Sequence, residues 1–375
     1  MRRAAVMIGM LAVTAATVTA CGVQDPDPRQ SVFLVTTATA NEQAQVIPDE
    51  IEKVLLKSAG VREAKATVLM PVEGAVTELA TVDLTVKRGQ DVEQDAARRE
   101  GGFAPTLEEL QSTVSSAHSK AKDLDALTGL DDAARRAEVS TIVVLSSGLQ
   151  TRGLADFAGL GWDFDQDQLL DGLQGQGFIP NLTDKRVYFV LGEVAGVQAP
   201  LPAPMRDTVR AFWSGVCERG KAADCQFVSA AGGGGPAATT PGVKTVPVPT
   251  FELQSRPAPE GRTSWSLDTA ALFSPDSATL LPEAKKLIGE AVPKITAGSS
   301  PVDIVGHTAH FGTPEGARRL ATERARAVAD ELQRAGVPAE KISSVRGVGY
   351  DEPLAAAPGQ DEAAANRAVV LTTTR

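Results

Sequence analysis

A run of small, glycine- and proline-rich residues divides this chain into two parts. The segment SAAGGGGPAATTPGVKTVPVPT, residues 229–250, contains four consecutive glycines and four prolines but few residues suited to a hydrophobic core. Glycine makes a linker flexible and proline stiffens it, and so long a stretch without secondary structure is uncommon inside one compact domain. The 375 residues also exceed the size of an ordinary single domain. We therefore predict two independent domains, 31–230 and 263–375, joined by a flexible linker over 231–262.

The region from 31 to 230 alternates strand-like and helix-like segments. Strands are predicted in SVFLVTTATAN, EAKATVLMPV, ATVDLTVKRG, STIVVLSSG, RVYFVLGEVAG and DCQFVSA. Helices are predicted in IPDEIEKVLLKSAG, over about 106–138, and in APMRDTVRAFWSGVCERG. This alternation is typical of a doubly wound α/β sheet, in which helices cover both faces of mostly parallel strands. The Glu73-Gly74 turn between two early strands predicts a hairpin and one antiparallel edge.

This order of elements resembles a von Willebrand factor A-type (vWA) domain across most of 31–230. Domains of that family often bind a divalent cation through a D-x-S-x-S motif after the first strand. Here the position reads Thr36-Thr37-Ala38-Thr39-Ala40-Asn41, and Ser146-Ser147-Gly148 stands where the family often has Ser-Asp-Gly. A hard cation needs anionic oxygen ligands, which both segments lack. We expect no metal in this cleft, and the resemblance implies that other envelope proteins could bind there.

A short acidic stretch within the same region has the spacing of a calcium loop. Asp163-x-Asp165-x-Asp167 matches the first three ligands of an EF-hand. However, Gln168 and Gln174 stand where the required glycine and glutamate should be. We therefore expect a solvated turn that caps the helix beginning in DQLLDGL.

No pattern in the chain predicts a catalytic set or a cofactor. Its three histidines are His118, His307 and His310, and the last two have no evident third metal ligand. Ser146 and Ser147 lack the flanking glycine of a nucleophile elbow. We predict that the protein is not an enzyme and holds no metal.

The N-terminus has the pattern of a lipoprotein signal peptide. Two arginines precede a short apolar stretch, and Val18-Thr19-Ala20-Cys21 follows it. Small residues directly before a lone cysteine resemble a bacterial lipobox, in which the cysteine is diacylated and becomes the first mature residue. We expect residues 1–20 to be removed, Cys21 to carry lipid and 21–30 to form a tether, because two acyl chains anchor a protein stably. Ordinary secretion with an incidental cysteine is the alternative.

Export also bears on the remaining cysteines. Cys217 and Cys225 are separated by seven residues. An exported pair at this spacing favours a disulfide bond over two free thiols, and a zinc site would need histidines nearby.

A permanent cation lies on the apolar face of a predicted helix in the second domain. The strand-like segment PVDIVG leads through a polar loop into this helix. Residues four apart share a helix face, so Leu320, Arg324, Val328 and Leu332 form one stripe. A guanidinium in such a place needs a carboxylate partner or an anionic ligand, and its planar fork suits bidentate binding of a carboxylate. The alternatives are an arginine that extends past its neighbours to solvent or one paired within the fold.

The other segments after the linker predict an α+β domain. A strand contains Trp265 and Leu267, and a helix follows Pro282, with Pro293 expected to end or kink it. Two further strands are predicted in ISSVRGVGYDEPLAA and NRAVVLTT.

Several short motifs then follow one another along about 263–375 in an order that indicates a family resemblance. In chain order these motifs are Phe-x-x-x-Ser-Ala, Leu-x-Pro, Val-Gly-His-Thr, Gly-Thr-Pro-Glu, Leu-x-x-x-Arg-Ala-x-Ala-Val, Gly-Val-Pro-Ala-x-x-Ile, Gly-x-Gly-Tyr-x-x-Pro and Asn-Arg-x-Val. The segment resembles the OmpA-like peptidoglycan-associated domain. Members of that family bind the stem peptide of the bacterial cell wall, where an aspartate and a helix arginine hold the charged ends of diaminopimelate.

The resemblance implies a peptidoglycan site with one half missing. Its residues would be Phe273, His307, Thr308, Arg324, Asn366 and Arg367. Arg324 falls on the position of the family arginine, but Ala309 stands where the family has the aspartate, and Ala317 and Ala368 replace two further family residues. Removing one member of a buried charge pair typically costs about 2–5 kcal/mol. Either Glu315 or Asp276 replaces the aspartate, or the ligand differs, for example an amidated stem peptide, or the domain only contacts proteins.

These observations predict an envelope lipoprotein without catalysis that links a membrane to the cell wall. The lipid would lie on the outer face of the cytoplasmic membrane, or in an outer membrane if the host has one. The alternative is a protein-interaction scaffold whose OmpA-like domain has lost peptidoglycan binding. A net charge of -10 with no basic run argues against nucleic acid as a partner. The alanine-rich, lysine-poor composition is typical of high-GC actinobacteria.

Overall fold

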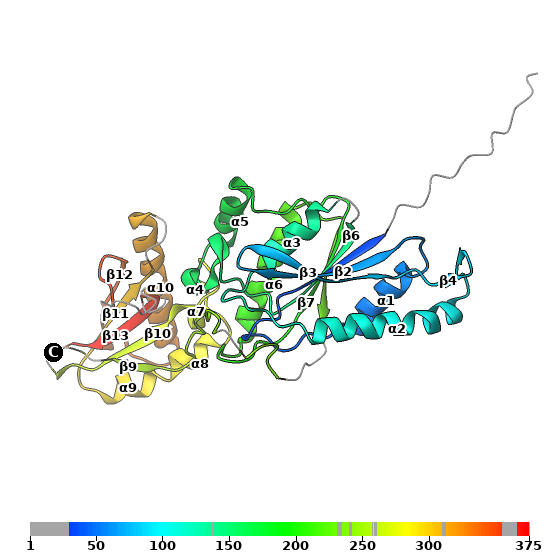
Figure 1. The fold of residues 1–375 in the computed structure, drawn as a ribbon. Helices are drawn as coiled ribbons and strands as arrows, with labels where there is room; N and C mark the ends of the chain where they lie inside the picture. The colour runs from blue at the N-terminus through cyan, green and yellow to red at the C-terminus, as the bar shows by residue number, and fades with distance from the viewer. Residues whose placement is uncertain are drawn as a thin grey trace, which may run out of the picture.

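Two separate sheets organise the chain (Figure 1). The computed structural model describes residues 30–136, 139–230, 235–239, 242–256, 258, 261–309, 313–354 and 366–374. Cys21 and the expected signal peptide and tether up to residue 29 lie outside these residues. Within the described part of the chain, no helix has the length and apolar character needed to cross a membrane.

The N-terminal sheet is doubly wound, as the alternation of segments predicted. Its strand order is β3-β2-β1-β6-β7-β8, and all neighbours are parallel except the β2–β3 hairpin at the edge. The strands are β1 (Ser31–Thr36), β2 (Lys65–Val72), β3 (Ala75–Asp83), β6 (Val139–Ser146), β7 (Arg186–Leu191) and β8 (Asp224–Ser229). The turn residues Glu73 and Gly74 both have positive φ, which suits a tight hairpin turn. The vWA resemblance stays a prediction, because this strand order is common to doubly wound folds.

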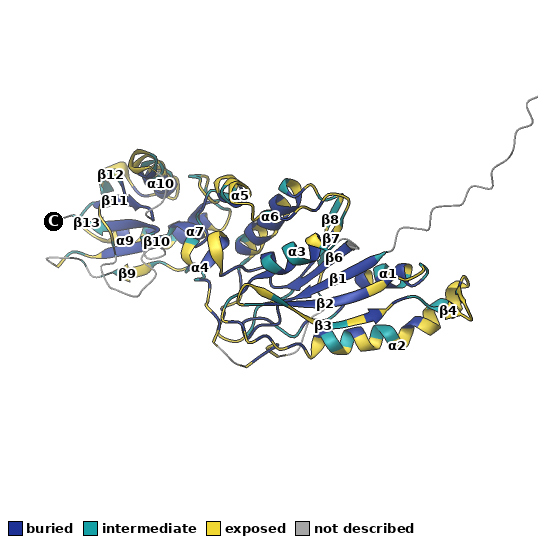
Figure 2. Ribbon diagram, turned by 45° about the horizontal axis from the view of Figure 1, so that its top comes forward, coloured by how far each residue is buried: buried dark blue, intermediate teal, exposed yellow. Residues whose placement is uncertain are grey.

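Helices cover both faces of this sheet because successive residues of its strands point to opposite sides. Val32 and Leu34 face one core with α1 (Asp49–Ser58) and α2 (Ala96–Ser115). Phe33 and Val35 face the other, with α3 (Ala126–Arg135), α5 (Gln166–Gly175) and α6 (Ala203–Arg219). The central strands are accordingly buried along their length, while the outer side of α2 is exposed (Figure 2). Two short pieces, η1 (Gly153–Ala155) and α4 (Phe157–Leu160), precede α5, and β4 (Lys87–Arg88) pairs with β5 (Asp91–Val92).

The helical stretch predicted over 106–138 is wrong in its extent. The structure has two helices, α2 and α3, separated by residues 116–125. Asp95 and Asp125 cap their N-termini by accepting hydrogen bonds from backbone N–H groups. His118 lies in the connection, where its Nδ1 contacts the carbonyl oxygen of Ala237 at 2.6 Å. The alanine-rich composition did not show this break.

Cys217 of α6 and Cys225 of β8 form a disulfide bond, as predicted. The bond ties the last helix of the N-terminal domain to its last strand.

The C-terminal sheet mixes parallel and antiparallel strands in the order β12-β11-β13-β10-β9. Its strands are β9 (Gln254–Arg256), β10 (Ser264–Asp268), β11 (Val302–His307), β12 (Ile342–Gly349) and β13 (Ala368–Thr373). The helices are α7 (Thr269–Leu272), α8 (Ala284–Gly289), α9 (Val292–Ala297), α10 (Pro314–Arg334) and η3 (Ala339–Lys341). Pro293 lies in the first turn of α9, so the predicted interruption of the helix separates α8 from α9.

The linker differs from the free segment that its composition predicted. Val243 and Val246 are buried against the N-terminal domain. The Gln198 side chain both accepts from the N–H of Val246 at 2.7 Å and donates to its carbonyl oxygen at 2.9 Å. Asn41 donates to the carbonyl oxygen of Val243 at 3.3 Å. The described part of the linker is therefore docked, because side chains elsewhere satisfy its backbone groups.

A buried carboxylate lies at the carboxyl ends of β1 and β6. Glu42 is fully buried, and its Oε1 accepts from the hydroxyls of Thr37, Ser146 and Ser147 and from the N–H of Ser147, at 2.7–2.9 Å. Its Oε2 accepts from the N–H and hydroxyl of Thr39 at 3.1 and 2.9 Å. The carboxylate therefore organises the two loops that, by the vWA resemblance, would hold a cation. Among the described residues, no cluster of three histidine, cysteine or acidic side chains could hold a metal.

We expect Glu42→Ala to lower the free energy of unfolding by about 3 kcal/mol or more, because six buried donors would lose their acceptor. Urea unfolding followed by circular dichroism measures this change. Glu108→Ala, at an exposed position of α2, is the matched control and should have little effect. Equal unfolding midpoints for the two variants would contradict the role assigned to Glu42.

Candidate functional site

Arg324 lies in the middle of α10, on the side that packs against the sheet. Its side chain is 1% exposed, and Val328 and Leu332 on the same stripe are buried in the C-terminal core. The helix approaches β11 and β12 closely because Gly306 and Gly347 have no side chains. A Cβ at either glycine would collide with the backbone of the helix. The two glycines thus fix the depth at which Arg324 sits.

The carboxylate that Arg324 requires comes from the N-terminal domain. Asp163, which lies 161 residues earlier in the chain, accepts from Nη1 through Oδ2 and from Nη2 through Oδ1, the latter at 2.6 Å. The third donor of the guanidinium, Nε, binds the carbonyl oxygen of Ser277 at 2.8 Å. The Asp163 side chain is 7% exposed. A bidentate, buried ion pair therefore joins the two domains.

The connection between α4 and α5 carries Asp163 to this position. Gly161 turns the chain with a positive φ of 66°, and the ring of Phe164 stacks on Phe157 in the N-terminal core. Trp162 Nε1 donates to the carbonyl oxygen of Pro247 in the docked linker at 2.6 Å. Asp165 then caps α5 by accepting from the N–H of Gln168. The connection is held on both sides of Asp163, so its carboxylate is presented by a rigid support.

The sequence-based expectation for the acidic stretch is therefore wrong in part. Asp165 does cap the following helix, as expected. Asp163, expected in a solvated turn, is buried and paired with Arg324. The missed signal was an arginine on an apolar helix face with no carboxylate close to it in the sequence.

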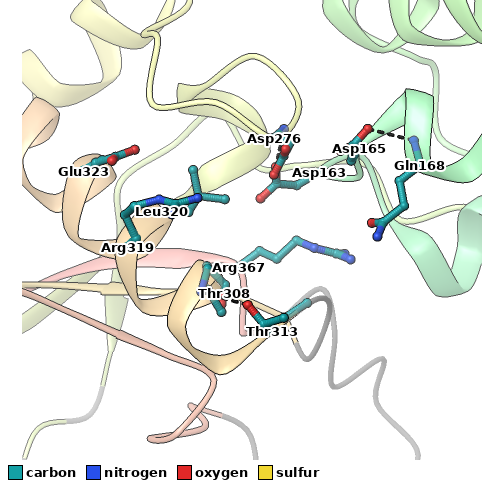
Figure 3. A pocket seen from close by; sticks show the side chains of 13 residues that line it. Asp163, Asp165, Gln168, Asp276, Thr308, Thr313, Arg319, Leu320, Glu323 and Arg367 are labelled. Carbon is teal, nitrogen blue, oxygen red and sulfur yellow. Dashed lines mark hydrogen bonds between the residues drawn. The ribbon is translucent and has the colours of Figure 1, made fainter.

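A cavity of about 270 Å³ lies beside the ion pair, between the two domains (Figure 3). Asp163 and Asp165 approach it from the connection before α5, and Arg319, Leu320 and Glu323 line it from α10. Further lining residues are Gln168, Asp276, Thr308, Ala309, Thr313, Gly316, Ala317 and Arg367. The cavity is thus lined by carboxylates from both domains and by guanidinium groups of the C-terminal domain.

The pKa values of Asp163 and Asp276 shift in opposite directions. Burial alone would raise the pKa of Asp163, but the hydrogen bonds and charge of Arg324 outweigh it, aided by the charge of Arg367, and hold this pKa below its usual value. Burial, then the negative charges of Asp165 and Asp163, raise the pKa of Asp276. Because a lowered carboxyl pKa stabilises the folded pair above the unfolded value of 3.8, the Asp163 contribution is lost only in acid below that value.

The structure brings four of the candidate peptidoglycan-binding residues together. Phe273 lies under Arg324, with 5.2 Å between its ring centroid and the guanidinium carbon. Thr308 and Arg367 line the cavity. The Thr308 hydroxyl is buried and has no hydrogen-bond partner among the described residues. Arg367 reaches across to the N-terminal domain and donates to the carbonyl oxygen of Leu160.

The other two candidates, His307 and Asn366, are not among the residues that line the cavity. His307 Nδ1 contacts the carbonyl oxygen of Glu352 at 3.0 Å, and burial is the main cause that lowers the pKa of this histidine. Asn366 accepts from the N–H of Leu354 at 2.6 Å. Both residues hold the chain after β12, so any contribution to ligand binding would be indirect.

Ala309 lines the cavity where the family resemblance places an aspartate. Of the two acidic residues considered as its replacement, Asp276 lines the same cavity and Glu315 does not. Asp276 also donates its backbone N–H to Asp163 at 3.1 Å. The geometry therefore favours Asp276 as a local carboxylate of the C-terminal domain.

The fold and the site together define an α/β domain followed by an OmpA-like domain. The model of the OmpA family matches residues 272–367. Outer membrane protein A of Klebsiella aerogenes is 30% identical over 95 residues, covering 24% of this chain and 27% of the relative. Outer membrane protein A of Shigella flexneri is 32% identical over 102 residues, covering 26% of this chain and 29% of the relative. The chain therefore spans less than a third of the length of these two relatives, and the similarity concerns the C-terminal domain.

Solved structures similar to this chain cover about a third of it or less. The cell wall anchor of the T6SS from Pseudomonas aeruginosa is 23% identical, with a TM-score of 0.29, over 32% of this chain and 87% of that chain. The peptidoglycan-associated lipoprotein from Burkholderia pseudomallei is 24% identical, with a TM-score of 0.25, over 28% of this chain and 88% of that chain.

A further acidic group lies at the edge of the site. Asp268 ends β10 and caps α7 by accepting from the N–H of Ala270 at 2.9 Å. Burial raises its pKa to about 6, although hydrogen bonds and the charge of Arg367 act in the opposite direction. Because its pKa is raised, the protonated carboxyl group of Asp268 stabilises the folded state. This contribution to the free energy of unfolding is complete below pH 3.8, the unfolded pKa, and is lost as the pH rises through about 6.

We expect the stability gained by Asp268→Asn over the wild type to depend on pH. The difference in the free energy of unfolding, variant minus wild type, should be about 1–2 kcal/mol larger at pH 8 than at pH 4. The amide oxygen can still accept from Ala270, and the variant avoids the cost of ionising a buried carboxyl group. Thermal unfolding at a series of pH values measures the difference. Asp330→Asn, at an exposed position on α10, should show no such dependence. A constant difference between Asp268→Asn and the wild type would overturn the assignment.

Proposed function

We propose that this protein is an envelope protein whose C-terminal domain binds peptidoglycan through the diaminopimelate of the stem peptide. The observation that carries the proposal is the bidentate seating of a carboxylate on Arg324. The buried guanidinium, which packs over Phe273, donates to both oxygens of this carboxylate in fork geometry. The match of residues 272–367 to the OmpA family supports the same ligand class.

Asp276 supplies the second charge that such a ligand needs. Diaminopimelate carries an ammonium group beside its carboxylate, and Ala309 cannot bind it. The Asp276 carboxyl group lines the same cavity, and its pKa is raised by burial and by neighbouring carboxylates. An ammonium group placed there would relieve that repulsion. The Thr308 hydroxyl, buried without a partner among the described residues, offers one further hydrogen bond.

The rest of the chain would join this domain to a membrane. The lipobox pattern at Cys21 predicts a lipid anchor, and the N-terminal α/β domain lies between anchor and wall domain. We assign no catalysis to the protein. Ser146 and Ser147, the serines at the end of β6, both donate to the Glu42 carboxylate.

A protein-interaction scaffold is the second candidate. Two observations favour it: Ala309 removes the family aspartate, and the ion pair with Asp163 already satisfies Arg324. In that case the OmpA-like domain would serve as a structural partner of the α/β domain.

We expect residues 22–375 to sediment with insoluble peptidoglycan and Arg324→Ala to lose at least tenfold in affinity, because the ligand carboxylate would lose its bidentate partner. Arg326→Ala, an exposed arginine on the same helix, is the matched control and should bind as the wild type does. Co-sedimentation over a range of wall concentrations measures both affinities.

Circular dichroism should first establish that both variants are folded. Equal binding by Arg324→Ala and the wild type would contradict the proposed site. If neither Asp163→Asn nor the wild type binds wall material, the scaffold becomes the preferred function.

A further inference from the structure

The carboxylate on Arg324 belongs to the protein itself. Asp163 occupies both terminal nitrogens of the guanidinium, and the Ser277 carbonyl oxygen occupies Nε. An arginine has five N–H donors in one plane, and a bidentate carboxylate takes the outer edge of that fork. A second carboxylate cannot use this edge at the same time. Binding of a ligand carboxylate at Arg324 therefore requires Asp163 to leave.

The contacts around Asp163 are those expected for a bound ligand rather than for a packed core. Its Oδ1 receives a second hydrogen bond from the backbone N–H of Asp276 at 3.1 Å, and its neighbour Leu160 accepts from Arg367. Arg324, Asp276 and Arg367 all belong to the C-terminal domain, whereas Leu160 ends α4 and Asp163 lies in the connection between α4 and α5. The connection thus enters the site of the other domain and forms hydrogen bonds there.

The interface around the ion pair is loosely packed. Besides the cavity of about 270 Å³, a second cavity of about 690 Å³ lies between the start of α6 and the loop after α7, and a third of about 350 Å³ lies below Trp162 and Arg367. Burying an ion pair contributes little net stability, because desolvation offsets most of the attraction. Domain interfaces of this polar kind resemble transient protein contacts. The two domains can therefore separate without unfolding either core.

We propose that Asp163 is an internal competitor that closes the peptidoglycan site of the C-terminal domain. In the closed form, the Asp163 carboxylate takes the place of the ligand carboxylate on Arg324. In the open form, the two domains separate at the connection before α5 and Arg324 becomes available to the wall. This inference rests on the proposed function and adds regulation to the same site.

The closed form lowers the apparent affinity for the wall. When only a fraction of the molecules is open, the apparent dissociation constant rises by the inverse of that fraction. Because Asp163 is tethered to the site through the docked linker, it competes at a high effective concentration. The cell wall, in which many stem peptides lie close together, offers a high local ligand concentration to compete with Asp163.

Asp163→Asn in the full mature chain tests this inference. The amide keeps the size of the side chain but removes the charge that pairs with Arg324. We expect this variant to bind insoluble peptidoglycan at least tenfold more tightly than the wild type in co-sedimentation. Asp167→Asn, which makes the same charge change at an exposed site four residues later, should bind as the wild type does. The double variant Asp163→Asn with Arg324→Ala should lose the gain.

Hydrogen exchange followed by mass spectrometry gives a readout that a change in folding alone would not produce. We expect the segment containing Asp276 and Ser277 to exchange faster in Asp163→Asn than in the wild type, while β11 and β13 keep their protection. Addition of peptidoglycan to the wild type should cause faster exchange in the connection around Asp163.

The outcomes separate the two proposals. If Asp163→Asn and the wild type bind the wall equally well, Asp163 is not a competitor, and the proposed function stands without this regulation. If Asp163→Asn, Asp163→Ala and the wild type all fail to bind, the proposed function and the competition are both overturned, and the ion pair is a permanent clamp between domains. Unchanged exchange at Asp276 in Asp163→Asn would also contradict an open form.

Discussion

The ion pair between Arg324 and Asp163 is the interaction on which the arrangement of this protein depends. Each partner is almost fully buried, and each would be costly to bury without the other. Cavities lie beside the pair, and Ala270 of α7 packs in the hydrophobic cluster of the N-terminal domain. This buried charge pair, together with the hydrogen bond from Arg367 to Leu160, therefore joins the two domains at the atoms that the proposed cell-wall ligand would need.

The sequence posed the problem of Arg324 correctly but could not locate its partner. Periodicity places this arginine on an apolar helix face, and solvation requires a carboxylate or an anion there. Motifs direct the search to the adjacent loop, where Ala309 offers none. Asp163 is separated by 161 residues, and within its own neighbourhood it resembles part of a calcium loop. Only the packing of the domains reveals the pairing, because no local pattern encodes a contact between distant segments.

The elements of both domains were predictable where hydrophobic period or turn chemistry was strong. The buried runs of β1 and β6, the hairpin at Glu73-Gly74 and the interruption at Pro293 are examples. The errors arose where a segment's structure was predicted from its composition alone. Alanine-rich sequence concealed the break between α2 and α3. In the linker, a few valines and the backbone partners Asn41 and Gln198 sufficed to dock a segment that looked free.

The glycines beneath α10 determine which part of the site can adapt. Gly306 and Gly347 let the helix lie so close to β11 and β12 that Arg324 cannot shift further toward the sheet. Helix α10 is therefore packed tightly against the sheet. Any force transmitted from a wall-bound C-terminal domain would reach the guanidinium without being absorbed by helix movement, and the first element to yield would be the connection that carries Asp163. Under the proposed function, tension between membrane and wall would therefore act on this one connection.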